Sequence, residues 1–121
     1  MSESQTIAIQ SEFDVFMARM QVRKLSRAMG FDITSQARIA LATSSLARAL
    51  GLGDTNHGQV IIDRLGEEEC PGVRVICTMN DGGEIDLTSQ TFADTRWLVD
   101  DLIVEKLPPD GLQVTVIKWM A

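Results

Sequence analysis

The chain has 121 residues, of which 45% are apolar and 23% charged, the composition of one soluble globular domain. Eleven Lys and Arg residues against 17 Asp and Glu residues give a formal net charge of −6. Nucleic-acid binding relies on neutralising phosphates, so this balance argues against it. The sequence has no apolar run of transmembrane length and no signal-peptide pattern at its start. We therefore expect a cytoplasmic protein that binds neither nucleic acid nor membrane, with no disulfide between Cys70 and Cys77.

The first predicted elements are a short edge strand over residues 6–10 and a helix that begins at Ser11. Asp14, three residues after Ser11, gives this start the form of a capping box. Gly30 fits the position just past the helix end, where a positive φ is needed. Apolar residues three and four apart predict the buried face, which Phe13 and Phe16 widen: Val15, Ala18, Val22, Leu25 and Met29.

A second helix is predicted from a cap at Thr34 or Ser35 to about Leu50, ended by Gly51 and Gly53. The loop that follows, residues 54–58, holds the single histidine, which has no metal-ligand neighbours and is expected to be solvated.

Two strands are predicted over residues 59–65 and 73–79, followed by a strong turn signal at residues 80–83. A third helix over residues 92–107 and a final strand over residues 112–119 complete the chain. The order β-α-α-β-β-α-β predicts a single α+β domain, a two-layer sandwich whose mainly antiparallel sheet carries its helices on one face.

Residues 36–50 resemble the N-box helix of the anti-sigma-factor serine kinases, which are GHKL (Bergerat-fold, histidine-kinase-like) ATPases. Residues 27–31 resemble the end of the family's preceding helix, residues 72–76 the strand before its G1 box, and residues 117–119 its closing strand. The resemblance spans most of the chain. It implies the GHKL fold, with ATP and magnesium as the ligands of an active member.

The chain departs from this family where the chemistry should be. The family's N-box has a glutamate before the Leu-Ala-Arg step as general base and an asparagine after it that holds magnesium. Here Ser45 and Ala49 occupy those positions. The serine cannot act as the general base, and the alanine cannot bind magnesium. Arg48 is retained, although a surface arginine on a helix is the more common explanation of such a residue.

The G1 box, Asp-x-Gly-x-Gly in the family, is also incomplete. An ungapped count places Met79 at its aspartate, whereas a shift of two residues places Asp81 there and Gly83 at the first glycine, with Ile85 at the second. Ser45, Arg48, Asp81, Gly82 and Gly83 are thus the candidate nucleotide contacts, although the last three are by themselves more typical of a turn. Residues 92–107 lack the glycines of the family's phosphate lid.

We therefore expect a degenerate GHKL domain without catalytic residues or a cofactor, acting as a regulatory protein-binding module. The resemblance implies a partner from a partner-switching system: a STAS-type antagonist, a phosphatase or a sigma factor. One alternative is a working ATP-dependent protein serine kinase that uses ATP and magnesium with atypical N-box and G-box residues. Another is an obligate subunit whose partner completes the nucleotide site. Homo-oligomerisation is left open.

Basic residues cluster on the two predicted N-terminal helices. Arg19, Arg23 and Arg27 are four apart and share one helix face. With Lys24, Arg38 and Arg48 they make up six of the eleven basic residues, and no acidic residue lies between Asp14 and Asp32. We expect Arg19, Arg23, Arg27 and Arg38 to meet an acidic protein surface; the alternative is an ordinary solvated face.

Overall fold

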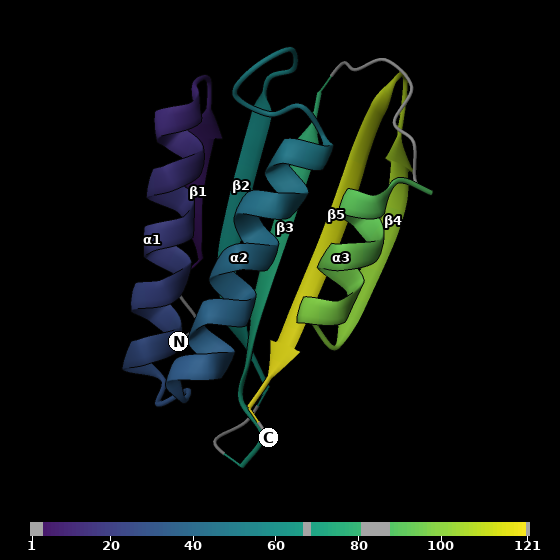
Figure 1. Cartoon of the computed structure of the whole chain (residues 1–121). Coiled ribbons are helices and arrows are strands. Elements are labelled where there is room, and N and C mark those ends of the chain that lie inside the picture. The colour runs from purple at the N-terminus through teal and green to yellow at the C-terminus, as the bar shows by residue number, and fades with distance from the viewer. Residues whose placement is uncertain (1–3, 67–68, 81–87, 121) are drawn as a thin grey trace.

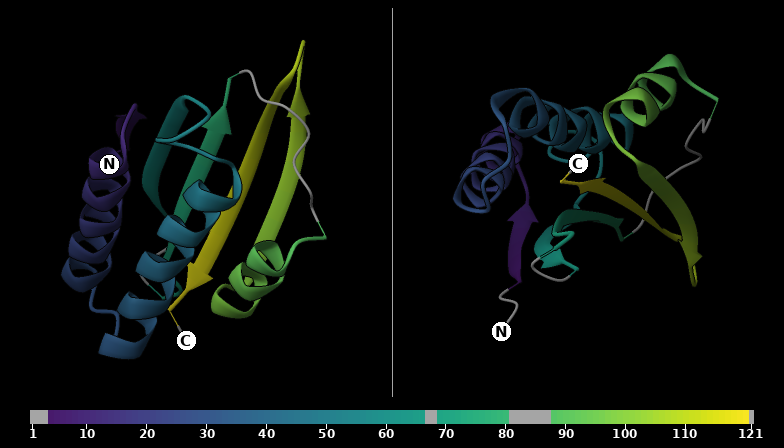
Figure 2. Two further views of the ribbon diagram at one scale, coloured as in Figure 1. Left: turned by 45° about the horizontal axis from the view of Figure 1, so that its top comes forward. Right: turned by 90° about the horizontal axis from the view of Figure 1, so that it is seen from below.

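Five strands form one sheet, and three helices lie side by side on one face of it, in the computed structural model of the chain (Figure 1). The structure describes residues 4–66, 69–80 and 88–120. Seen from below, helices and sheet form two separate layers (Figure 2). The predicted α+β two-layer sandwich is therefore confirmed. The elements in chain order are β1 Gln5–Ile9, α1 Glu12–Ala28, α2 Ile33–Ala49, β2 Gly58–Leu65, β3 Gly72–Met79, α3 Gln90–Leu98, β4 Asp101–Leu107 and β5 Gly111–Trp119.

The strand order in the sheet is β1-β2-β3-β5-β4, and all four neighbouring pairs are antiparallel. The strands β1 and β4 are consequently the two edges. Across the sheet the helices lie in their chain order, with α2 between α1 and α3 (Figure 1).

The predicted third helix is wrong beyond Leu98, because the chain forms the strand β4 there. In β4, Leu102 and Val104 are half-buried, whereas Asp101, Ile103 and Glu105 are exposed. This alternation has the period of a strand. The strand pairs with β5, and the order becomes β-α-α-β-β-α-β-β.

The first helix departs from the prediction on two points. Ser11 is its N-cap but makes no side-chain cap bond, whereas Asp14 Oδ2 accepts from the Gln10 N–H at 2.9 Å. Phe13 and Phe16 were expected to widen the buried face, and they are 66% and 54% exposed. The buried face of α1 is narrower and consists of Ala18, Val22 and Ser26.

The second helix begins two residues earlier than predicted. Asp32 is its N-cap and accepts from the Ser35 N–H at 2.7 Å, so neither Thr34 nor Ser35 caps it. Gly30 has φ of +94° just past α1, as predicted, and it turns the chain quickly enough for Asp32 to serve as the cap.

The core lies between the helix layer and the sheet, and α2 contributes most of its helical residues. Ile39, Leu46 and Leu50 of α2 are fully buried. Small residues on the same helix, among them Ala40, Ala42 and Ala47, are buried as well, and small side chains let neighbouring elements approach closely. Within the described part of the chain, the opposite face of the sheet carries no helix (Figure 2).

Candidate functional site

The N-box positions lie in the last turns of α2. Ser45 and Ala49 are one helical turn apart and both half-buried, and Arg48 is exposed. A hydroxyl and a methyl group at these positions offer neither a base nor a magnesium ligand. Arg48 is the basic residue of the last turn, where a cation favourably meets the negative end of the helix dipole.

Only one of the two alignments of the G1 box falls on residues that the structure describes. Asp81, Gly82 and Gly83 lie outside the described residues. Met79, the ungapped alternative, ends β3 with only 1% exposure and belongs to the hydrophobic core. Its thioether could not take the place of an aspartate that binds an amino group. Among the residues that the structure describes, no group of three or more His, Cys, Asp or Glu side chains could hold a metal ion.

The predicted basic residues are accessible to a partner. Arg19, Arg23 and Arg27 are all exposed on α1, and Arg38 is exposed on α2. Ion pairs within the described ranges join Arg74 to Asp63 and Lys118 to Asp100, and neither involves α1. The positive charge of α1 is therefore available for an intermolecular contact.

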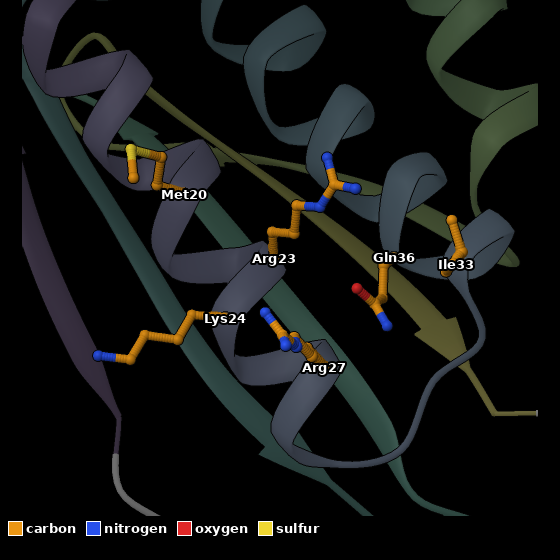
Figure 3. Close-up of a pocket in the computed structure, with 6 residues that line it drawn as sticks. All are labelled: Met20, Arg23, Lys24, Arg27, Ile33 and Gln36. Carbon is orange, nitrogen blue, oxygen red and sulfur yellow. The ribbon is translucent and has the colours of Figure 1, made fainter.

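The structure places two of these arginines in a groove between α1 and α2 (Figure 3). This α1–α2 groove has a volume of about 470 Å³. In Figure 3, Arg23 extends toward α2, whereas Lys24 points away toward the β1 side. Arg19 and Arg38 do not line it. The lining residues are Met20, Arg23, Lys24, Arg27, Ile33 and Gln36.

The floor of the groove is fixed by the turn between the helices. Gln36 is buried, and its Nε2 donates to the Phe31 carbonyl oxygen at 2.7 Å. The N-cap Asp32 lies on the same turn. The backbone N–H of Ser35 lowers the pKa of the Asp32 carboxyl, its side chain adds to this effect, and Lys118 and Arg38 contribute further. The helix junction therefore carries a fixed carboxylate beside the basic face.

Sequence reasoning missed Met20, Ile33 and Gln36 as groove residues. Ile33 is 74% exposed and Met20 49% exposed, which no periodicity argument predicts for apolar side chains. The sequence contained one signal for Met20. It is seven residues from Phe13 and four from Phe16, so the three side chains share one face of α1.

The fold is an α+β two-layer sandwich in which α2 lies between α1 and α3. No known protein-family model matches the chain. The chain is 24% identical over 133 aligned positions to the serine/threonine-protein kinase RsbT of Bacillus subtilis (strain 168), and the alignment covers 99% of each chain. The similarity thus extends along almost the full length of both proteins.

The two cysteines are free, with Cys70 exposed and Cys77 buried. No helix in the described part of the chain is long and apolar enough to cross a membrane.

Proposed function

We propose that this protein is a regulatory protein-binding module of the anti-sigma or partner-switching type, with a degenerate GHKL domain that does not transfer phosphate. The observation that carries this proposal is the pair Ser45 and Ala49 on a helix that otherwise resembles an N-box. Phosphoryl transfer depends on charge neutralisation and positioning, and these two side chains provide no magnesium ligand. Full-length similarity to RsbT supports the partner-switching class.

The partner-binding surface in this proposal is the basic stripe, Arg19, Arg23, Arg27 and Arg38. An acidic surface on a STAS-type antagonist, a phosphatase or a sigma factor would complement it. Complementary charge speeds encounter and selects between partners more than it strengthens the final complex. The stripe therefore suits a protein that exchanges partners.

The first test is thermal unfolding in millimolar ATP with and without magnesium. A ligand at about 100 times its Kd would stabilise the folded state by about 2.7 kcal/mol, a shift that is readily measured. We expect no shift. A saturable rise in melting temperature with Mg-ATP would overturn the proposal that the GHKL domain is degenerate. It would support the alternative that RsbT's name favours, an ATP-dependent protein serine kinase. A shift that requires a partner protein would support a nucleotide site shared between subunits.

The second test reverses charge on the basic stripe. Arg19→Glu with Arg23→Glu should leave the melting temperature nearly unchanged, since substitutions at exposed positions usually change stability by less than about 0.5 kcal/mol. Partner binding should be lost, most clearly at low salt. The matched control is Arg64→Glu with Arg96→Glu, two exposed arginines on β2 and α3. Unchanged binding of the native partner by the α1 variant would remove the stripe from the proposal.

A further inference from the structure

A row of exposed apolar side chains runs along the outer side of α1. Phe13, Phe16 and Met20 are 66%, 54% and 49% exposed. Their spacings of three and four residues place them on one helix face. Single exposed apolar residues are ordinary, but three in register on one helix, two of them aromatic, are typical of a binding surface.

This apolar row is continuous with the α1–α2 groove. Met20 belongs to both, and the basic residues Arg23, Lys24 and Arg27 follow it along the helix. From Phe13 to Arg27 the surface is about 21 Å long, at about 1.5 Å per helical residue. One end is therefore apolar and aromatic, and the other is basic.

We propose that the outer face of α1 and the α1–α2 groove bind an acidic amphipathic helix of the protein partner. Its apolar residues pack on Phe13, Phe16 and Met20, and its carboxylates face Arg23, Lys24 and Arg27. This inference rests on the proposed function and names the chemistry of the partner segment that the site accepts.

The occupant is a helix because this surface offers side chains alone. The backbone N–H and C=O groups of α1 are used within the helix, so an extended segment would gain no backbone hydrogen bonds there, as it would at a sheet edge. A helix instead presents anchors at i, i+3 and i+7, the spacing of Phe13, Phe16 and Met20. Its ridge of side chains can lie in the groove between α1 and α2.

The occupant is acidic because the basic residues of α1 form no ion pair with any residue that the structure describes. The ion pairs of the described residues lie on other elements, and residues 15–31 contain no carboxylate. The neighbouring Asp32 carboxylate is engaged as the N-cap of α2. An aromatic and basic helix face also suits an anionic membrane surface. The concave groove, with the buried Gln36 amide fixed in it, favours a protein segment over a flat lipid surface.

The experiment uses the full chain and a fluorescein-labelled designed peptide of 18 residues. The peptide carries Leu at i, i+3 and i+7 and Glu at i+10, i+11 and i+14, and a second peptide has the same composition in scrambled order. We expect fluorescence anisotropy to show binding of the designed peptide about tenfold tighter than of the scrambled one. This ratio corresponds to about 1.4 kcal/mol.

Two variants test the apolar half and the basic half of the site independently. Phe13→Ser with Phe16→Ser should weaken peptide binding by about tenfold while the salt dependence persists. Arg23→Glu with Arg27→Glu should weaken it and reverse the salt dependence, because the introduced glutamates repel those of the peptide and salt screens this repulsion. Trp97→Ser and Arg64→Glu with Arg96→Glu are the matched controls, since these residues are exposed on other elements, and they should bind as the wild type does.

Equal binding of the two peptides, or full binding by the phenylalanine variant, would overturn the inference. So would binding of the wild type to phosphatidylglycerol vesicles that the phenylalanine variant loses, because the face would then be a lipid surface. If reversal of the arginines abolishes native-partner binding while the phenylalanine variant retains it, the proposed function stands and this inference fails. A magnesium-dependent ATP shift would overturn the proposed function without affecting the peptide result.

Discussion

Arg74 holds Asp63 with two parallel hydrogen bonds across the β2–β3 pair. Arg74 Nε donates to Asp63 Oδ1 at 2.9 Å and Nη2 to Oδ2 at 2.6 Å. The two residues are direct cross-strand partners. Hydrogen bonding to Asp63 raises the pKa of Arg74, which keeps the guanidinium charged. This bidentate pair links two central strands of the sheet.

The two halves of this pair should differ in their importance for stability. The Asp63 side chain is 13% exposed and that of Arg74 35%. Arg74→Ala leaves a largely buried carboxylate without its partner, and we expect a loss of about 2 kcal/mol; Asp63→Ala leaves a guanidinium that can reach water, and we expect about 1 kcal/mol. Urea unfolding of both variants measures the difference. Equal losses would contradict the role assigned to burial.

Gly58 at the start of β2 should not tolerate a side chain. A Cβ there would collide with the Thr78 carbonyl oxygen and lie 2.9 Å from Leu52 Cδ2. We expect Gly58→Ala to destabilise the protein by about 2 to 3 kcal/mol, in the range of overpacked sites. Gly30→Ala is the comparison, because a Cβ at Gly30 meets only Met120 at 3.9 Å and the loss comes from its positive φ alone. Thermal unfolding should rank Gly58→Ala as the more damaging change.

The two cysteines should react very differently with thiol reagents. Burial raises the pKa of the Cys77 thiol from 9.0 to about 12, whereas Cys70 is exposed. Ellman's reagent at pH 8 should therefore titrate one thiol in the native protein and two after unfolding. Because the folded state holds the Cys77 proton more tightly, its contribution to stability is complete below pH 9.0 and declines as pH rises toward 12. Loss of the fast thiol in Cys70→Ser would verify the assignment.

The Asp32 cap should make α2 sensitive to acid. Its pKa lies below 3.8 in the folded state, chiefly because the Ser35 backbone N–H donates to the carboxylate. The stabilisation is therefore present above pH 3.8 and is lost as pH falls through the lower folded value. Asp32→Ala should lower the melting temperature at pH 7, and the difference from the wild type should disappear in strong acid. Asp32→Asn retains a capping oxygen that does not titrate, so its deficit relative to the wild type should be smaller at pH 7 and should also shrink as acid protonates the wild-type Asp32.

Restoring the N-box side chains should not create a kinase. Ser45→Glu with Ala49→Asn returns a base and a magnesium ligand to α2. The sequence still lacks the second G1 glycine, and residues 92–107 remain free of glycine. Because positioning and electrostatics supply most of the rate in phosphoryl transfer, we expect no ADP formation above that of Ser45→Gln with Ala49→Leu. ADP release by the first variant alone would show that the missing glycines are dispensable.

The sequence correctly predicted those elements in which the spacing of apolar residues fits either a helix or a strand but not both. The helices around Val22 and Leu46 and the strands around Val60, Val75 and Val116 are all present, with bounds close to those expected. In each of them the apolar spacing matches one period over the whole element.

The region of β4 was mispredicted because its pattern is ambiguous. Residues 98, 99, 102, 103 and 107 are apolar and satisfy a helical period, yet Leu102 and Val104 also alternate with polar or exposed neighbours. Pairing with β5 decides in favour of the strand. Periodicity within one segment contains no information about such a distant partner.

Phe13 and Phe16 were misassigned to the core for a related reason. Apolar character shows that a side chain can be buried, but the position of α2 determines which face of α1 is covered. Arg19, Arg23 and Arg27 are exposed on α1, as expected for residues on one solvent-facing helix face, whereas their binding to a partner stays a prediction. The α1–α2 groove could not be predicted, because it depends on how closely two helices pack and on where Ile33 is placed.

The indole of Trp119 lies over Gly72, its cross-strand partner, where a Cβ would come within 2.6 Å of Cε3. The other tryptophan, Trp97, is 83% exposed on α3. The protein therefore contains two native fluorophores in contrasting surroundings. Iodide should quench the Trp97 emission strongly and that of Trp119 weakly. Trp97→Phe would then leave Trp119 as an unlabelled optical reporter at the end of β5, where its backbone N–H and indole N–H donate to Asp100 and Asp101.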